Sequence, residues 1–208
     1  MAPGLALTLS GTGITNNSGI QQNFFVGGVE PISVVGLLFT NTSTAGNSSI
    51  ENYGLTMFVN RSTAGSSSIF NGGNMAFNDN SSAGGADITN LSFSFSTFSD
   101  NSSAGSANIG LYDAAFLQFV DHSSAGNATI GTLESSIVFS GSSTAGSASI
   151  TDIGAFLVFF GSSTGGTAQI ELGFSSLFQR AAVLEIDGHN FPGVTIGSIE
   201  GDENTFVS

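Results

Sequence analysis

The octapeptide SSAGNATI, residues 123–130, is one of seven near-copies of a single segment in this chain. A catalytic motif is normally needed once, whereas a segment that returns at a near-constant interval is typical of a structural repeat. The other copies are STAGNSSI (43–50), STAGSSSI (62–69), SSAGGADI (81–88), SSAGSANI (102–109), STAGSASI (143–150) and STGGTAQI (163–170).

A phenylalanine precedes each octapeptide, so the full repeat reads F-x-x-x-S-[ST]-[AG]-G-x-[AS]-x-I. From this phenylalanine to the final isoleucine the distance is always 11 residues, whereas from the isoleucine to the next phenylalanine it is 8, 8, 10, 10, 9 and 9 residues, and 8 again to Phe178. A constant length indicates regular stacked backbone, because one inserted residue would turn every following side chain to the other face. Loops are therefore expected only in the variable half.

The end of each octapeptide alternates between a small residue, a polar residue and the isoleucine, and a period of two is typical of a β-strand. The glycine before this triplet predicts a turn with positive φ. A repeat of 19–21 residues with short strands and no helical period predicts an all-β, right-handed parallel β-helix, with one coil per repeat and ~4.8 Å between coils.

In this fold the repeated phenylalanines and isoleucines form ladders inside the solenoid, where burial of each contributes about 1.5–3 kcal/mol. The small residues fill the narrow parts of the interior, and the polar residue between them points outward. The predicted ladders are Phe39, Phe58, Phe77, Phe98, Phe119, Phe139 and Phe159, together with Ile50, Ile69, Ile88, Ile109, Ile130, Ile150 and Ile170.

The chain is predicted to be one β-solenoid domain. Residues 39–177 form seven regular coils, residues 1–38 an N-terminal degenerate coil or cap, and residues 178–208 irregular C-terminal coils or a cap. The repeat frame decays after Phe178, although strand-like alternation continues.

Composition excludes several classes of partner. The 208 residues include 2 Lys and Arg against 15 Asp and Glu, for a net charge of −13. So few cations argue against binding to nucleic acid or to an anionic membrane surface. No apolar run approaches the ~20 residues of a membrane-spanning helix, and the absence of Cys excludes disulfides and thiolate metal sites. The apolar content of 40% with 19 Phe favours a packed core over disorder.

The repeat resembles the passenger repeats of autotransporter-type and related large bacterial surface proteins. The opening GTGITNNSGIQQNF (11–24) also resembles that family, and the tail VTIGSIEGDENTFV (194–207) resembles the G-S-[LI]-E-G segment that follows such arrays, so the likeness covers most of the chain. It implies a secreted or cell-surface location, with the signal peptide and the translocator barrel not in this chain. It is weak for function, because adhesins, enzymes and toxins share the same spine.

A serine nucleophile needs a base, and the chain has two histidines. His122 lies beside Asp121 and Ser123, which suggests a compact cluster, but its position varies between repeats and is read as a solvated surface position. His189, in DGHNFPG, is read as a turn residue. Metalloprotease, phosphate-loop and nucleophile-elbow motifs are absent, so no catalytic residue and no cofactor is assigned.

Asp79, Asp100 and Asp121 occupy the same repeat position, two residues after the ladder phenylalanine, and should stack about 5 Å apart. The preferred interpretation is a column screened by water or capping backbone amides at a corner. The alternatives are a cation column holding a structural Ca²⁺ and, as a third, a pair of catalytic carboxylates.

A second column consists of the hydroxyl residues at the second position of each octapeptide. Such an array could recognise a glycan or ice, but the preferred reading is that these hydroxyls close backbone hydrogen bonds at the corner. The column comprises Thr44, Thr63, Ser82, Ser103, Ser124, Thr144 and Thr164.

The sequence thus favours a non-enzymatic structural spine with an adhesion or spacer role, whose partners are a host surface, a glycan or further copies of itself. One alternative is a filament subunit that stacks end to end. Another is a β-helix enzyme that acts on polysaccharides.

Overall fold

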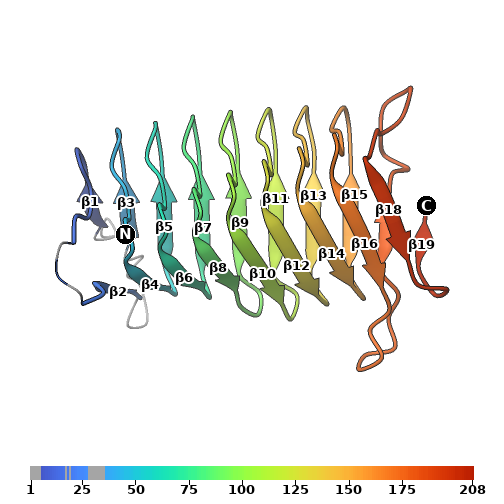
Figure 1. Cartoon of the computed structure of the whole chain (residues 1–208), viewed down its shortest axis with the longest axis horizontal. Coiled ribbons are helices and arrows are strands. Elements are labelled where there is room, and N and C mark those ends of the chain that lie inside the picture. The colour runs from blue at the N-terminus through green and yellow to red at the C-terminus, as the bar shows by residue number, and fades with distance from the viewer. Residues whose placement is uncertain (1–5, 17, 19, 28–35) are drawn as a thin grey trace, which may run out of the picture.

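The computed structural model describes residues 6–16, 18, 20–27 and 36–208, and within these ranges every helix or strand assigned is a β-strand. The strands lie side by side along one long axis (Figure 1). The chain is a parallel β-solenoid, as the repeat predicted.

Successive strands alternate between two sheets, and neighbours within each sheet pair in parallel. The ten-stranded sheet contains β1 (Ala6–Leu9), β3 (Gly36–Phe39), β5 (Leu55–Phe58), β7 (Asn74–Phe77), β9 (Phe95–Phe98), β11 (Phe116–Phe119), β13 (Ser136–Phe139), β15 (Phe156–Phe159), β17 (Val183–Glu185) and β19 (Phe206–Val207). The nine-stranded sheet contains β2 (Asn23–Val26), β4 (Ser49–Asn52), β6 (Ser68–Asn71), β8 (Asp87–Asn90), β10 (Asn108–Tyr112), β12 (Thr129–Leu133), β14 (Ser149–Ile153), β16 (Gln169–Gly173) and β18 (Ser198–Gly201).

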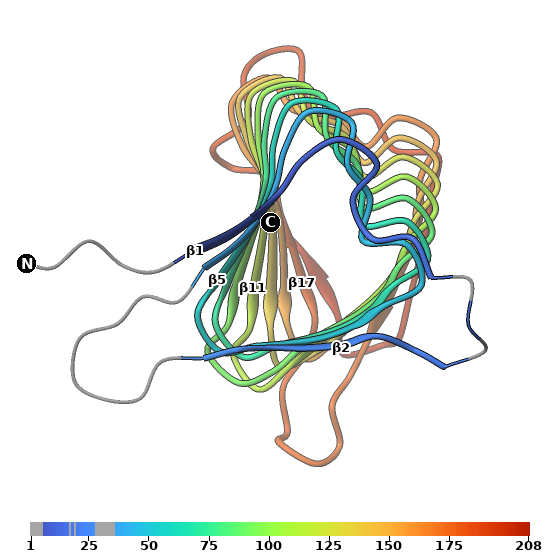
Figure 2. The same ribbon diagram turned by 90° about the vertical axis from the view of Figure 1, so that its left-hand side faces the viewer.

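A third side closes each coil, as the view along the axis shows (Figure 2). It is built from single parallel bridges between the hydroxyl residues of successive octapeptides, such as Ser103 to Ser124 and Ser124 to Thr144. The constant half of the repeat therefore runs from the end of the ten-stranded sheet, across this third side, to the start of the nine-stranded sheet.

The predicted phenylalanine ladder is confirmed. All seven side chains have 0% exposure, and the strand register places each opposite the next, as in the pairs Phe98 with Phe119 and Phe119 with Phe139. Neighbouring rings stack with centroids 4.5 to 4.9 Å apart and planes within 12° of parallel. The spacing of the coils sets this distance, because each ring projects from an equivalent backbone position.

The isoleucine ladder is confirmed as well, since all seven side chains are at most 2% exposed and successive ones are paired in register. The small residue two positions earlier is buried in each coil, and the residue between them points outward. The glycine of every octapeptide has positive φ, and this corner is tight: a Cβ on Gly126 would lie 2.6 Å from Gly105 O. Glycine is required there by both conformation and space.

A polar ladder lies inside the first regular coils, two residues after the isoleucines. Asn52 Nδ2 donates to Asn71 Oδ1 at 2.7 Å, and Asn71 Nδ2 donates to Asn90 Oδ1 at 2.9 Å. The Ser96 hydroxyl donates to the same Asn90 oxygen at 2.6 Å. These buried amides satisfy one another from coil to coil, which removes the cost of burying them.

Length variation falls at the corner between the nine-stranded and ten-stranded sheets, in the predicted variable half. The largest insertion, between β16 and β17, contains Phe178, which the repeat spacing would place in the ladder. Phe178 is instead 49% exposed, and the register aligns Leu184 of β17 with Leu157 of β15. An ion pair of 2.9 Å between Arg180 and Glu134 ties the insertion to the earlier corner.

Both ends of the solenoid continue the two sheets. In the N-terminal segment, predicted as a degenerate coil or cap at 1–38, β1 and β2 pair with the first regular coil, whereas residues 1–5, 17, 19 and 28–35 lie outside the described residues. At the other end β18 and β19 pair with β16 and β17. Among the described residues, no strand pairs with the outer edges of β1, β2, β18 or β19.

Candidate functional site

The aspartate column lies at the corner that follows the ten-stranded sheet. Asp79, Asp100 and Asp121 have φ of 58°, 56° and 56°, a left-handed conformation that Asn, Asp and Gly adopt most readily. The same corner holds Asn41 and Asn60, also at positive φ, in the earlier coils. The corner conformation therefore explains the residue types in this column.

Each carboxylate also accepts a backbone hydrogen bond from the preceding coil. Asp79 N–H donates to Asp100 Oδ2 at 3.0 Å, and Asp100 N–H donates to Asp121 Oδ2 at 3.2 Å. Asn60 N–H donates to Asp79 Oδ2 at 2.8 Å in the same way. This is the capping arrangement, one of the two forms that the preferred interpretation of the column allowed.

The cation column remains a prediction. Across the described ranges, no group of three or more His, Cys, Asp or Glu side chains is placed to hold a metal ion. One oxygen of each carboxylate in the column already accepts the bond described above, which gives the column a structural role without a cation.

The hydroxyl column lies on the third side of the solenoid and closes the corner turns. In Thr63, Ser103 and Ser124 the side-chain oxygen accepts the N–H of the glycine two residues later, at 2.9 to 3.0 Å. The local turn accounts for this column, as the sequence favoured.

The histidines do not assemble catalytic clusters in the described part of the chain. His122 is exposed, and the neighbouring Ser123 hydroxyl is turned inward, where it donates to Val120 O at 2.7 Å. His189 lies in a turn, with Nδ1 2.7 Å from Asn190 O and Nε2 2.6 Å from Ser163 O. The expectation of a surface residue and a turn residue is confirmed.

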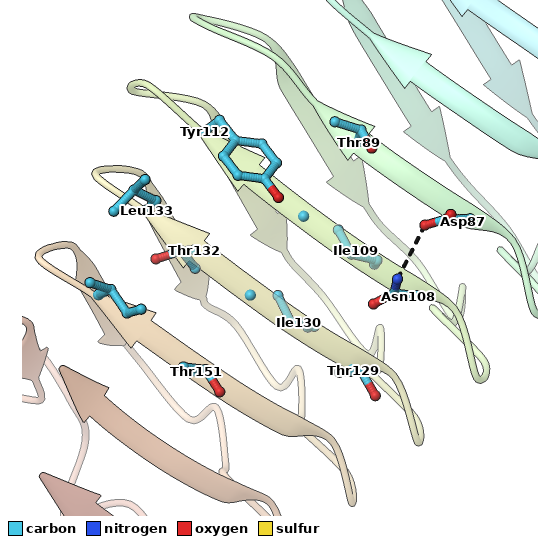
Figure 3. A pocket seen from close by; sticks show the side chains of 13 residues that line it. Asp87, Thr89, Asn108, Ile109, Tyr112, Thr129, Ile130, Thr132, Leu133 and Thr151 are labelled. Atoms are coloured by element: carbon cyan, nitrogen blue, oxygen red, sulfur yellow. Dashed lines mark hydrogen bonds between the residues drawn. The ribbon is translucent and has the colours of Figure 1, made fainter.

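A hollow that the repeat pattern did not predict lies on the outer face of the nine-stranded sheet (Figure 3). Gly110 of β10 and Gly131 of β12 are paired neighbours in register and leave a gap in the outward column of side chains. Nothing lies within 4 Å of where a Cβ of Gly131 would be. The resulting groove encloses about 450 Å³.

Tyr112 forms one wall of this groove. A Cβ on Gly110 would lie 3.0 Å from Tyr112 Cε2, so the ring lies against the glycine, and 45% of the residue remains exposed. Leu133 and Ile153 continue this apolar side on the next two coils. The groove thus offers an aromatic ring beside aliphatic side chains.

The opposite wall is polar. Asn108 Nδ2 donates to Asp87 Oδ1 at 3.2 Å, and Thr129 follows on the next coil. These side chains retain further donor and acceptor capacity. An apolar wall facing a few polar groups is the usual composition of a small-molecule site.

The carboxyl group of Asp152 lies inside the solenoid. It is 0% exposed, with Oδ1 accepting from Thr132 Oγ1 at 2.7 Å and Oδ2 lacking a hydrogen-bond partner. Burial raises the pKa of Asp152 from 3.8 to about 6, partly offset by the bond from Thr132. Its enclosure keeps it away from any substrate, so its effect is on stability.

Within the described residues no helix is long and apolar enough to cross a membrane. Comparison with protein-family models, curated proteins and solved structures finds no match to this chain.

Proposed function

We propose that this chain is a non-enzymatic structural spine of a secreted or surface-displayed bacterial protein, and that its role is adhesion. The observation that carries the proposal is that the repeated polar side chains accept hydrogen bonds from backbone N–H groups. The Asp100 carboxylate accepts the N–H of Asp79, and the Ser124 hydroxyl accepts the N–H of Gly126. Side chains that join neighbouring coils, like Asp100, or close a turn within one coil, like Ser124, favour a scaffold over a catalyst. The secreted or surface location rests on the resemblance of the repeat.

Adhesion is favoured over a spacer role by the groove at Gly110 and Gly131. A saccharide ring has an apolar face of C–H groups and a rim of hydroxyls. The Tyr112 ring suits the first, and Asp87 and Asn108 suit the second. The net charge of −13 disfavours an anionic polymer. The ligand class proposed is therefore a neutral glycan.

The test is to measure binding and hydrolysis on one panel of neutral and anionic oligosaccharides. Tyr112→Ala removes the aromatic wall, and Gly131→Leu fills the hollow, so each should weaken binding of a neutral glycan at least about tenfold, or ~1.4 kcal/mol. Phe70→Ala is the matched control, because Phe70 is an exposed aromatic residue of the same sheet outside the groove. Binding that depends on the groove, without release of reducing ends, supports adhesion.

Two other outcomes have definite meanings. Release of reducing ends that tracks the protein through purification contradicts the non-enzymatic proposal and favours the polysaccharide-acting alternative. Absence of binding to every glycan on the panel contradicts the adhesion role and leaves the spacer role.

A filament subunit is the second candidate, supported by the outer strands at both ends, whose outer edges pair with no strand of the described residues. Leu7 of β1 is 50% exposed and Phe206 of β19 is 60% exposed, and unpaired strand edges invite pairing with another chain. The carboxylates near the C-terminal end oppose such stacking at neutral pH. Electron microscopy at pH ~3, below the ordinary pKa values of carboxylates, distinguishes the two: long fibres one solenoid wide support the filament.

A further inference from the structure

The floor of the groove is one column of outward positions on the nine-stranded sheet. The strand register makes Thr89, Gly110, Gly131 and Thr151 consecutive members of this column. A threonine side chain therefore stands at each end of a gap that is two glycines long. The groove is closed at both ends of its floor, although its walls run parallel to the solenoid axis.

The two glycines are not equally open. A Cβ on Gly110 would lie 3.0 Å from Tyr112 Cε2 and 3.3 Å from Tyr112 Oη, whereas nothing lies within 4 Å of a Cβ on Gly131. The Tyr112 ring thus occupies the place above Gly110. The open part of the floor is the single position of Gly131.

Side chains surround this opening on four sides. Thr129 and Leu133 lie two residues before and after Gly131 on the same strand, each about 7 Å away, and the neighbouring coils supply the other two sides, each ~4.8 Å away. Figure 3 shows the four residues around the gap: Thr129, Leu133, Tyr112 and Thr151.

The coil spacing decides how much fits in the opening. On the other sheet, the outward rings of Phe95 and Phe116 lie on neighbouring coils with centroids 5.1 Å apart, so one six-membered ring fills about one coil. Between the Tyr112 ring and Thr151 only the coil of Gly131 is unfilled. The opening therefore has room for one ring.

The column beyond the threonines does not continue the hollow. Thr151 Oγ1 donates to Glu171 Oε2 at 3.3 Å, and Glu171 is the next member of the column. On the far side of Thr89 the next member is Phe70, whose side chain projects outward and is 42% exposed. A linear chain of sugar rings laid along this column would have to rise over side chains at both ends of the gap.

We propose that the groove is a one-ring site, which binds the terminal residue or a one-residue branch of a neutral glycan and not the interior of a linear chain. This inference rests on the proposed function, because it specifies which part of the glycan enters. The apolar face of the sugar ring packs against Tyr112. Thr129 is exposed, and its hydroxyl can donate to and accept from the sugar hydroxyls. The glycosidic oxygen faces solvent, because side chains close the opening along the sheet.

A nuclear magnetic resonance titration of the intact chain tests the size of the site. The probes are the methyl glycosides of glucose, galactose and mannose, each compared with a linear tetrasaccharide of the same sugar. For a sugar that binds, we expect the tetrasaccharide to bind no more than about threefold more tightly than the methyl glycoside, because only one ring is held. A larger gain with chain length overturns the one-ring site.

Two matched variants test what ends the site. Thr151→Gly opens a second coil next to Gly131, so the preference for the tetrasaccharide over the methyl glycoside should rise at least about fivefold. Thr89→Gly makes the same change in the same column, but the Tyr112 ring separates it from the opening, so it should leave that preference unchanged. Far-ultraviolet circular dichroism checks that both variants are folded. Equal preferences in the two variants overturn the proposal.

Failure of the one-ring site differs from failure of the proposed function. If tetrasaccharides bind much more tightly than methyl glycosides and Phe70→Ala removes the gain, a neutral glycan is bound but lies along the column past Thr89, which overturns the one-ring site alone. If no methyl glycoside and no tetrasaccharide binds, the adhesion role fails and the one-ring site fails with it.

Discussion

Substitution of Asp100 separates the three roles that its column could have. Asp100 Oδ2 accepts the Asp79 N–H at 3.0 Å, and Asp100 itself has φ of 56°. Asp100→Ala loses an exposed hydrogen bond, worth about 1 kcal/mol, and places alanine in a left-handed conformation, at a cost of about 1 kcal/mol. The expected loss of unfolding free energy is therefore about 2 kcal/mol.

Asp100→Asn should be close to neutral. Its amide oxygen can accept the same N–H, as Asn60 Oδ1 already does from Asn41 N–H at 3.1 Å. It also removes repulsion from Asp79 and Asp121, which in water at this spacing amounts to less than about 1 kcal/mol. Asp100→Gly should fall between the two, because glycine tolerates the corner conformation but cannot accept the bond.

Urea unfolding followed by circular dichroism measures the series, and the same samples are melted with calcium and with chelator. We expect the order Asn, Gly, Ala from most to least stable, with no response to calcium. An alanine variant as stable as the original would refute the hydrogen-bond and conformation argument. A calcium-dependent rise in melting temperature that disappears in Asp100→Asn would establish the cation column instead.

Three further outcomes are expected from urea unfolding. Ile109→Ala should cost about 2–5 kcal/mol because it leaves a cavity, whereas Asn108→Ala beside it should cost under about 1 kcal/mol; equal losses would contradict the inward and outward assignment. Gly126→Ala should severely destabilise or prevent folding, whereas Gly131→Ala should be nearly neutral, since only the first meets backbone at 2.6 Å with positive φ; a tolerated Gly126→Ala would contradict the tight corner. Burial raises the pKa of Asp152 from 3.8 to about 6, so the folded state keeps this proton at pH values where the unfolded state has lost it. The free energy of unfolding should therefore fall by about 3 kcal/mol as pH rises from ~4 to ~6. Asp152→Asn should abolish that component, and an unchanged pH profile would contradict it.

The repeat made most of the core predictable. Side chains at equal phase in a parallel stack must lie on one another, so constant spacing alone assigned Phe98 and Ile109 to the interior. The spacing to Phe178 also matches, but the regular coils were predicted to end at residue 177, and an inserted loop indeed carries Phe178 to the surface. The spacing between two residues predicts which residues are paired only where the backbone between them is regular. The backbone of the insertion between β16 and β17 is irregular.

The candidate groove and Asp152 needed information beyond the octapeptide. Asp152 follows the buried Ile150 by two residues, and residues two apart in a strand point to the same face. Extending the predicted strand past the isoleucine would therefore have placed Asp152 inside the solenoid. Gly110 and Gly131 occupy the same position in adjacent coils, so the missing side chains of the hollow could also have been predicted from the sequence. The placement of the Tyr112 ring against Gly110 depends on local packing in three dimensions, and no spacing rule supplies it.

The positions that differ between coils are therefore where a function specific to this chain must lie. A residue that is repeated in every coil, such as Gly126 or Phe119, is explained by its structural role in a corner or a ladder, because stacked coils need the same residue at that position. A residue that differs from its equivalents in the other coils has no such structural explanation. The glycine gap beside Tyr112 and the exposed Phe95 and Phe116 are departures of this kind, in the central coils, and the two sheets direct them to different faces. The glycine gap therefore gives the repeat array one place, beside Tyr112, whose shape the other coils do not share.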